Sequence, residues 1–478
     1  MDVVLQRVVG AAMAGSSLYE VVLETSEEFK QWLEKEVGMT ATELGGEPYF
    51  RQTDIVMNPT SGEPALPAGI QYQSPQEIFG DANGGSLFIK GDGESMAAHY
   101  SDVNQGELAD AWLMSALAMV ARYGKAASIF TGHGDDGVVV QLHKLNKDPR
   151  MFGTWDSPFE QSVTYALPTK DGKLCYTYSD EAGELWPAMA EKAVAAAYHG
   201  TAGNEKNGYD VLLEGNAAMG MAMLLGGTPF TVKLNKVTDA GNQSQLLFRA
   251  WKKLLRQGCT VIVYFENDAN GLEKSRPYTV FSLQKIDGAL GPTFLVLFRS
   301  PRGKQAQDCA AGTGGVWNGK WSDCDTDGWA ANSVAKAQCD WNGRKDDGTF
   351  WMAFEDIVAN LGDRYTVFIP SDPELRKINL TDHTSLGLAA ASSKLEGQLN
   401  ASFAQLMANN GLGENVNKFA TFAIDALQQV GQVASAANQI QGQAESVKEQ
   451  AEDTAAHAQS IVGKIPGAAD MLGKCVVM

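Results

Sequence analysis

The chain has 478 residues, of which 44% are hydrophobic and 20% charged, enough for two or three globular units with apolar cores. Its 38 lysines and arginines are outnumbered by 57 aspartates and glutamates, so the net charge is −19. A surface this acidic repels phosphate backbones, so no nucleic-acid partner is expected. The sequence has no apolar run of membrane-spanning length and no secretory leader pattern, which predicts a cytoplasmic protein.

Residues 1–75 are treated as an N-terminal segment. They predict one short amphipathic helix, Ser26–Leu33, with Ser26 as its N-cap. Nothing in this segment indicates chemistry.

The most informative stretch runs from residue 101 to residue 118 and predicts a buried helix preceded by a polar turn. Its key residues are Gln105-Gly106 and, after a short spacer, Asp110-Ala111-Trp112-Leu113. This pattern resembles the nucleophile helix of the calpain family of papain-like cysteine proteases, with alanine at the cysteine position. The resemblance implies that Gln105 is the oxyanion donor and that Ala111 stands where the attacking thiolate belongs.

The other two triad positions are changed as well. The family segment Gly-His-Ala-Tyr-Ser-Val matches residues 275–280, which places Arg276 at the histidine position. The segment Arg-Asn-Pro-Trp-Gly matches residues 299–303, which places Ser300 at the asparagine position. Arginine stays protonated and cannot act as a general base, so the resemblance implies a chain that has lost catalysis.

Three further motifs occur in the family's order. They are Ser74–Ile78, Glu184–Ala193 and Asp347–Asp356. The resemblance therefore covers residues 45–370 and implies an α+β fold, the papain-like calpain protease core. It predicts a helical half over residues 76–230, a β-rich half over 231–370 and a cleft between them. Trp112, Trp186 and Trp351 are expected to anchor this scaffold by burial.

Ser115 is a candidate substitute nucleophile. It lies one turn after Ala111, but none of the six histidines is placed by the sequence to pair with it. We therefore expect Ser115 to be a small packing residue.

The resemblance also implies candidate calcium ligands. Asp102 and Glu184 match acidic ligands of one loop site, and Asp323 and Asp347 match two of a second. Thr349 and Val316 replace acidic residues of the family, and an insertion at residues 91–96 alters the first loop. Because calcium needs about six to eight oxygens, weak binding is the most that these residues predict.

The six cysteines form no Cys-x-x-Cys pair. Cys309, Cys324 and Cys339 are evenly spaced without nearby histidines, and we expect them to be free thiols. The last cysteine differs, because Cys475-Val-Val-Met478 fits a farnesylation signal. It predicts attachment to the cytosolic face of a membrane, although one prenyl chain alone holds a protein only marginally.

Residues 371–478 predict a helical tail. Leu388, Leu395, Leu399, Phe403 and Leu406 suggest one helix, and Asn409–Gly411 a turn. Apolar or small residues then follow a 3.5-residue spacing from Phe419 to Ile465, typical of a coiled-coil seam. A helical hairpin is the simplest arrangement; docking on the chain's own core, self-association and docking on another protein all remain open.

The sequence thus predicts a calpain-like pseudoprotease, tethered to a membrane through Cys475, that binds a protein or peptide segment in its cleft or scaffolds a complex. Arg276 and Arg302 are expected to make the cleft floor positive, which favours an acidic peptide. Two alternatives are a calcium-dependent cysteine endopeptidase and a structural coiled-coil adaptor.

Overall fold

The computed structural model describes most of the chain up to residue 408. The described residues are 21–23, 27–52, 55–80, 85–91, 97–133, 137–145, 154–201, 204–206, 208–234, 242–288, 291–304, 315–343, 347–381 and 389–408. All of them lie in the first of the two units into which the chain divides, residues 1–421.

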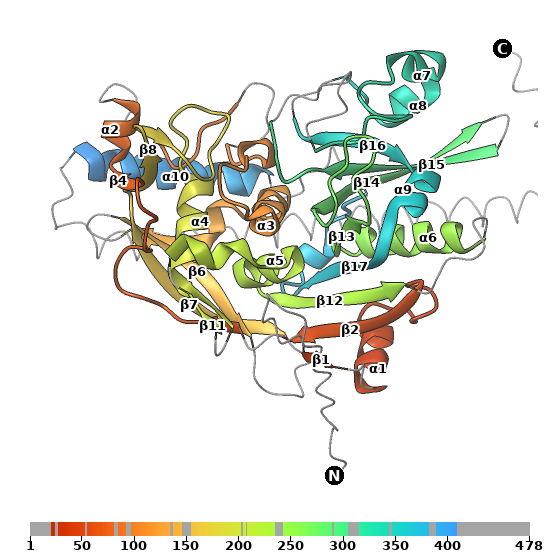
Figure 1. Cartoon of the computed structure of the whole chain (residues 1–478), viewed down its shortest axis with the longest axis horizontal. Helices are drawn as coiled ribbons and strands as arrows, with labels where there is room; N and C mark the ends of the chain where they lie inside the picture. The colour runs from red at the N-terminus through yellow and green to blue at the C-terminus, as the bar shows by residue number, and fades with distance from the viewer. Residues whose placement is uncertain are drawn as a thin grey trace, which may run out of the picture. The chain divides into compact units, whose positions relative to one another are not determined.

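The first half of the core is built around three apolar helices (Figure 1). They are α3 (Ala111–Arg122), α4 (Trp186–Ala197) and α5 (Ala217–Leu225). Eleven of the twelve residues of α3 and all twelve of α4 are buried, including the charged residues Arg122 of α3 and Glu191 and Lys192 of α4. The half predicted as helical also contains several strands, three of which pair in sequence order as an antiparallel set: β5 (Phe130–His133), β6 (Gly137–Leu145) and β7 (Trp155–Thr164).

The second half is an antiparallel sheet in the order β16-β15-β14-β13-β17-β12. Its strands are β12 (Gly227–Leu234), β13 (Thr260–Phe265), β14 (Pro277–Gly288), β15 (Gly291–Arg299), β16 (Thr349–Ala353) and β17 (Leu361–Pro370). Two helices pack on this sheet, α6 (Asn242–Arg256) and α9 (Phe354–Asn360). Trp251 of α6 joins them, since its ring contacts both Phe354 and Tyr365.

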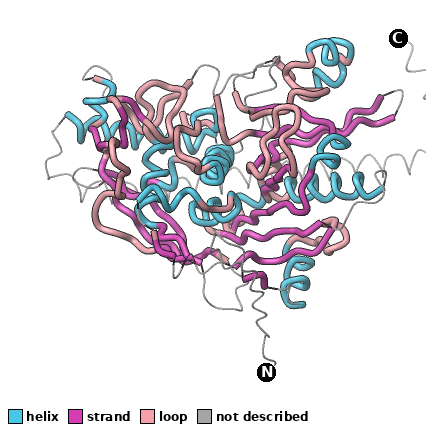
Figure 2. Tube along the Cα trace, in the orientation of Figure 1, coloured by secondary structure: helices cyan, strands magenta, loops and turns pink. Residues whose placement is uncertain are grey.

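The two halves share one sheet of eleven strands. The join is narrow, because β7 pairs with β12 only where Trp155 faces Gly227. Figure 2 shows α3 nearly end-on between the strands of the two halves. The core shared by the two halves is therefore formed around α3.

The N-terminal segment is part of the same fold. Strand β2 (Gly46–Gln52) pairs with β12, and β1 (Val21–Leu23) pairs with β2. Helix α1 (Glu27–Glu36) contains most of the predicted amphipathic stretch and begins after Ser26. Its Phe29 is fully buried against Phe50 and Phe230.

Short elements complete the described fold. They are β3 (Ile55–Met57), β4 (Gln71–Gln73), α2 (Pro75–Phe79), η2 (Tyr100–Asp102), η3 (Ala127–Ile129), β8 (Leu167–Lys170), β9 (Lys173–Leu174), β10 (Tyr198–Thr201), β11 (Asn204–Glu205), η5 (Gly208–Leu213), α7 (Thr326–Ala331), α8 (Ser333–Gln338) and η6 (Leu375–Lys377). The predicted motif at residues 74–78 forms a capping box, in which Ser74 and Glu77 bind each other's backbone N–H groups.

The tail begins with helix α10 (Ala389–Ala408), which docks on the core. Leu395, Leu399 and Phe403 are buried, and the Phe403 ring meets Tyr165 at 4.7 Å. Glu396 is almost fully buried and accepts the backbone N–H groups of Ala97 (2.9 Å) and Ala98 (3.2 Å).

A second polar side chain fastens the same helix. Asn400 of α10 binds both the N–H and the C=O of Phe88, with the N–H bond at 2.9 Å. The predicted turn after α10, the long seam from Phe419 to Ile465 and the Cys475 signal lie outside the described residues. No helix in the described part of the chain combines the length and the apolar character needed to cross a bilayer.

The expectation that the cysteines are free is wrong at one position. Cys324 is disulfide-bonded, with a partner outside the described residues, whereas Cys175, Cys259 and Cys339 are buried free thiols. Even spacing in the sequence carries no information about which sulfur atoms meet in space, so the pattern could not identify this bond.

The contacts of Glu396 predict a test of how firmly α10 is held. Glu396→Ala would leave two N–H groups without their carboxylate, and the free energy of unfolding should fall by about 2–3 kcal/mol. Gln398→Ala, at a half-exposed position of the same helix, should change it by less than about 0.5 kcal/mol. Urea denaturation of the full chain measures both values, and equal stability of the two variants would contradict the role given to Glu396.

Candidate functional site

The N-terminus of α3 reaches the site and is fixed by Trp112. The indole Nε1 donates to Leu212 O at 2.7 Å, and the ring packs so closely on Gly215 that a Cβ there would lie 2.1 Å from it. Ala111, the first residue of α3, is partly exposed, in contrast to the buried residues that follow. The fold therefore presents position 111 at the surface of the site with a methyl group.

Arg276 lies directly before β14 and reaches across to the first half. Its Nη1 donates to Gln105 Oε1 at 2.9 Å, while Gln105 Nε2 donates to Leu108 O at 2.7 Å. Because a guanidinium is only a donor, the amide must turn its oxygen toward Arg276 and its N–H groups toward the interior. The predicted oxyanion donor is thus engaged by protein acceptors, and the histidine position holds a permanent cation.

Glu273 is the residue of this site that sequence reasoning missed. Its carboxylate pairs with both Arg276 and Arg302, and all three side chains are partly buried. Two cations and one anion leave a net charge of +1, less than the two arginines alone suggested. The available signal was the i, i+3 spacing of Glu273 and Arg276, a common spacing for ion pairs.

Ser300, at the asparagine position, is fully buried. Its N–H donates to Gly348 O at 2.8 Å, and its Oγ accepts the N–H of Arg302 at 3.4 Å. The neighbouring Arg299 donates to Val103 O at 2.7 Å. Burial lowers the pKa of Arg299 to about 10, so the side chain is still charged at neutral pH.

The two halves approach closely beside Ser300. Gly303 has a φ of 70°, and a Cβ there would lie 2.1 Å from Asn104 Oδ1. The same oxygen accepts the N–H of Lys304 at 2.5 Å, while Asn104 Nδ2 donates to Asp180 at 2.7 Å. Only glycine fits this left-handed, crowded position, so residues 103–104 and 299–304 form a fixed contact between the halves.

Ser115 has the structural role expected for it. It is buried, and its hydroxyl donates to Pro277 O at 3.2 Å. Among the histidines whose side chains are described, His99 bonds to Ser101 and His143 lies near Met223 O. These contacts supply no base to Ser115.

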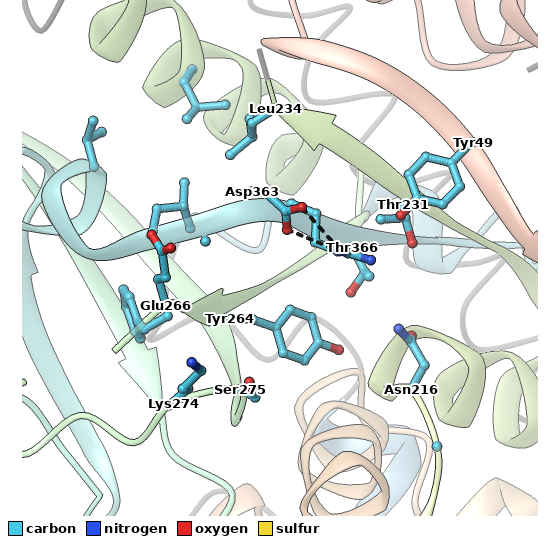
Figure 3. Close-up of a pocket in the computed structure, with 17 residues that line it drawn as sticks. Tyr49, Asn216, Thr231, Leu234, Tyr264, Glu266, Lys274, Ser275, Asp363 and Thr366 are labelled. Atoms are coloured by element: carbon cyan, nitrogen blue, oxygen red, sulfur yellow. Dashed lines mark hydrogen bonds and ion pairs between the residues drawn. The ribbon is translucent and has the colours of Figure 1, made fainter. Parts of the chain in front are cut away.

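A pocket of about 770 Å³ lies next to Arg276 (Figure 3). It is lined from the first half by Gly215 and Asn216 and from the second by residues that include Tyr264 and Ser275. In Figure 3 the Tyr264 ring extends into this space, with Asn216 on one side and Glu266 and Lys274 on the other. The pocket has the mixed apolar and polar lining typical of a ligand site.

The candidate calcium ligands of the first loop are engaged with protein donors. Asp102 Oδ2 accepts the N–H of His99 at 2.6 Å and the indole of Trp186 at 3.2 Å. Glu184 accepts the N–H of Ile89 at 2.7 Å and the hydroxyl of Ser179 at 2.5 Å.

The second candidate pair is bound in the same way. Asp323 Oδ1 accepts the Trp341 indole at 2.9 Å, and Asp347 Oδ1 accepts the N–H and hydroxyl of Thr349, both at 2.8 Å. Across the described ranges, no three His, Cys, Asp or Glu side chains gather as a metal site would require. Calcium binding stays a prediction.

Comparison with known proteins places this sequence in a family. The pattern described as "Calpain family cysteine protease" matches residues 47–363, about two thirds of the chain. The chain belongs to the calpain family. The resemblance found in the motifs is thereby confirmed, as is the mixed helix-and-sheet fold with a calpain protease core.

Individual relatives agree with this. The chain is 27% identical over 299 residues to "Calpain-2 catalytic subunit" of Mus musculus, covering 61% of this chain and 38% of that protein. It is 26% identical over 297 residues to "Calpain-1 catalytic subunit" of Homo sapiens, 61% of this chain and 37% of that protein. "Calpain clp-1" of Caenorhabditis elegans is 26% identical over 264 residues, 54% and 31% respectively. The chain thus spans less than two fifths of the length of these relatives.

Proposed function

We propose that this calpain-family chain is a pseudoprotease, a catalytically inactive scaffold that binds a protein segment in the cleft between its halves. The observation that carries the proposal is the contact of Arg276 with Gln105, together with alanine at the partly exposed position 111. Peptide hydrolysis by a cysteine protease needs a thiolate, a base that also returns a proton to the leaving amine, and an oxyanion donor. Alanine, arginine and an inward-turned amide supply none of these functions.

Restoring the thiol alone should not restore activity. In Ala111→Cys, Arg276 would stand beside the sulfur, and its cation could favour a thiolate but could not protonate a leaving amine. We expect no cleavage of casein, with or without calcium, by the wild type or by this variant.

The control is the triple variant Ala111→Cys, Arg276→His, Ser300→Asn, which contains all three triad residues of the family. Alkylation of the thiol introduced at position 111 in both variants would verify that it is accessible. Cleavage by the wild type, or by Ala111→Cys at a rate near that of the triple variant, would contradict the proposal and favour the endopeptidase alternative.

The proposed guest is an extended acidic peptide. The arginine pair with Glu273 keeps one net positive charge at the mouth of the cleft, and the adjacent pocket of about 770 Å³ offers room for an apolar side chain. Charge complementarity of this kind affects specificity and association rate more than raw affinity. Calcium has no part in this proposal, and weak binding by Asp102 and Glu184 remains a separate prediction.

Two fluorescent peptide pools test the guest, one rich in Asp and Glu and one in Lys, both with the same apolar positions. The wild type should bind the acidic pool better at low salt, and Arg302→Glu should weaken that binding about tenfold, which corresponds to ~1.4 kcal/mol. Arg249→Glu, at an exposed position of α6, makes the same charge change away from the cleft and should have little effect. Equal binding of both pools, or equal loss in the two variants, would reject the acidic guest.

We also propose that Cys475 is farnesylated and brings the protein to the cytosolic face of a membrane. The support is the sequence Cys475-Val-Val-Met478 alone. Since one prenyl chain binds membranes only marginally and few lysines lie nearby, attachment should be reversible or assisted by a partner. Self-association through the tail would also strengthen membrane attachment, because it brings two prenyl chains together.

Labelling with a farnesyl diphosphate analogue and purified farnesyltransferase tests this directly. The wild type and Lys474→Ala should be labelled, whereas Cys475→Ser should not. Labelled protein should co-float with vesicles only partly and less at high dilution. An unlabelled wild type would remove the membrane proposal and leave the cleft proposal intact.

A further inference from the structure

Two acidic side chains face each other beneath the α3 N-terminus. Asp110, the residue before α3, is fully buried, and Glu191, in the middle of α4, is 1% exposed. Each carboxyl group influences the pKa of the other through a side-chain hydrogen bond. Neither belongs to the triad positions or to the candidate calcium ligands.

The hydrogen bonds of this pair are incomplete unless a proton is present. Asp110 Oδ1 accepts Gln105 Nε2 at 3.5 Å, and Glu191 Oε2 accepts the N–H of Thr177 at 3.3 Å. The remaining oxygens, Asp110 Oδ2 and Glu191 Oε1, are buried and accept a hydrogen bond from no donor among the described residues. Two carboxylate oxygens cannot bond to each other, but a carboxyl O–H can donate to a carboxylate.

The surroundings do not offer a positive charge instead. The groups that face the pair are Gln105 from the preceding loop, Thr177, Cys175 and Tyr176 from the segment after β9, and Tyr209 of η5. Among the largest influences on the pKa of either carboxyl there is no lysine, arginine or histidine of the described residues. Burial raises the pKa of Asp110 to about 7 and that of Glu191 well above its usual range.

We propose that Asp110 and Glu191 share a proton that joins the N-terminus of α3 to α4, and that losing this proton loosens the joint. The pair would then act as a pH-sensitive element under the cleft. It is connected to the cleft through Gln105, whose oxygen accepts from Arg276. The proposal does not depend on what the cleft binds or on whether the chain is inactive.

The direction of the pH effect follows from the raised pKa values. Above the ordinary carboxyl pKa values the unfolded chain has lost the proton that the folded pair keeps, because the pKa of Asp110 is raised to about 7 and that of Glu191 well above its usual range. Stability therefore falls as pH rises above those ordinary values, and it keeps falling until the folded pair loses the proton. For one retained proton the unfolding equilibrium constant rises about tenfold per pH unit.

Glu191→Gln removes the shared proton while keeping the shape, and Asp110→Asn does so from the other side. Asp110 makes no side-chain capping bond to α3, so this second change does not remove a cap. Glu107→Gln is the control, because Glu107 is an exposed acid in the same region that pairs with Lys170. Urea unfolding of the full chain at several pH values between about 5 and 7 measures the stability of each protein.

We expect the unfolding constant of the wild type and of Glu107→Gln to rise about tenfold more per pH unit than that of Glu191→Gln. Infrared difference spectra near neutral pH should show a protonated carboxyl band in the wild type that Glu191→Gln lacks. This band can be sought in wild-type protein alone, so the test does not require that either variant folds. Equal pH slopes in the wild type and Glu191→Gln, or no such band near neutral pH, would overturn the proposal.

Discussion

The burial of α3 between the two halves is the constraint on which the rest of the structure depends. Eleven of its twelve residues are buried, and they contact α5, β14 and the segment around η2. Only its first residue, Ala111, remains partly exposed. Because the packing of the helix begins at Trp112, a thiol at position 111 contributes to chemistry and almost nothing to folding. The scaffold can therefore lose its nucleophile without losing its core.

Arg276, at the predicted histidine position, affects the fold in a different way. A protonated arginine placed in a half-buried cleft needs acceptors, and the fold supplies Glu273 and the oxygen of Gln105. These bonds connect the loop before β14 to the loop before α3. Together with Arg299 on Val103 O and the close approach of Gly303 to Asn104, they hold the two halves at a fixed spacing. Arg276 is thus a structural link across the site.

Much of the fold could be predicted from the sequence, because the decisive signals are local. The apolar stretch of α3, the capping box at Ser74 and the four-residue spacing of Leu395, Leu399 and Phe403 each describe one segment. Strands β5–β7 were not predicted, although in β6 the buried Val138, Val140 and Leu142 alternate with more exposed residues, a period of two that is typical of a strand.

Contacts between distant segments could not be predicted in this way. Glu396 binds the N–H groups of a loop nearly three hundred positions earlier, and those groups carry no side-chain signature.

The same difference between local sequence signals and contacts of distant segments is found at the site. Motif order predicts positions 111, 276 and 300 as a set, since each is defined by its neighbours in the chain. The pairing of Glu273 with Arg302, which lowers the positive charge predicted for the cleft, could not be predicted because it joins two distant loops. The direction of the Gln105 amide likewise follows from a donor-only partner that arrives from the other half.

The sequence therefore predicts which residue types occupy this site, whereas the packing decides which hydrogen bonds their side chains make. Gln105 shows this most directly, because its amide oxygen accepts from Arg276 on one side and its amide nitrogen donates to the buried carboxyl of Asp110 on the other.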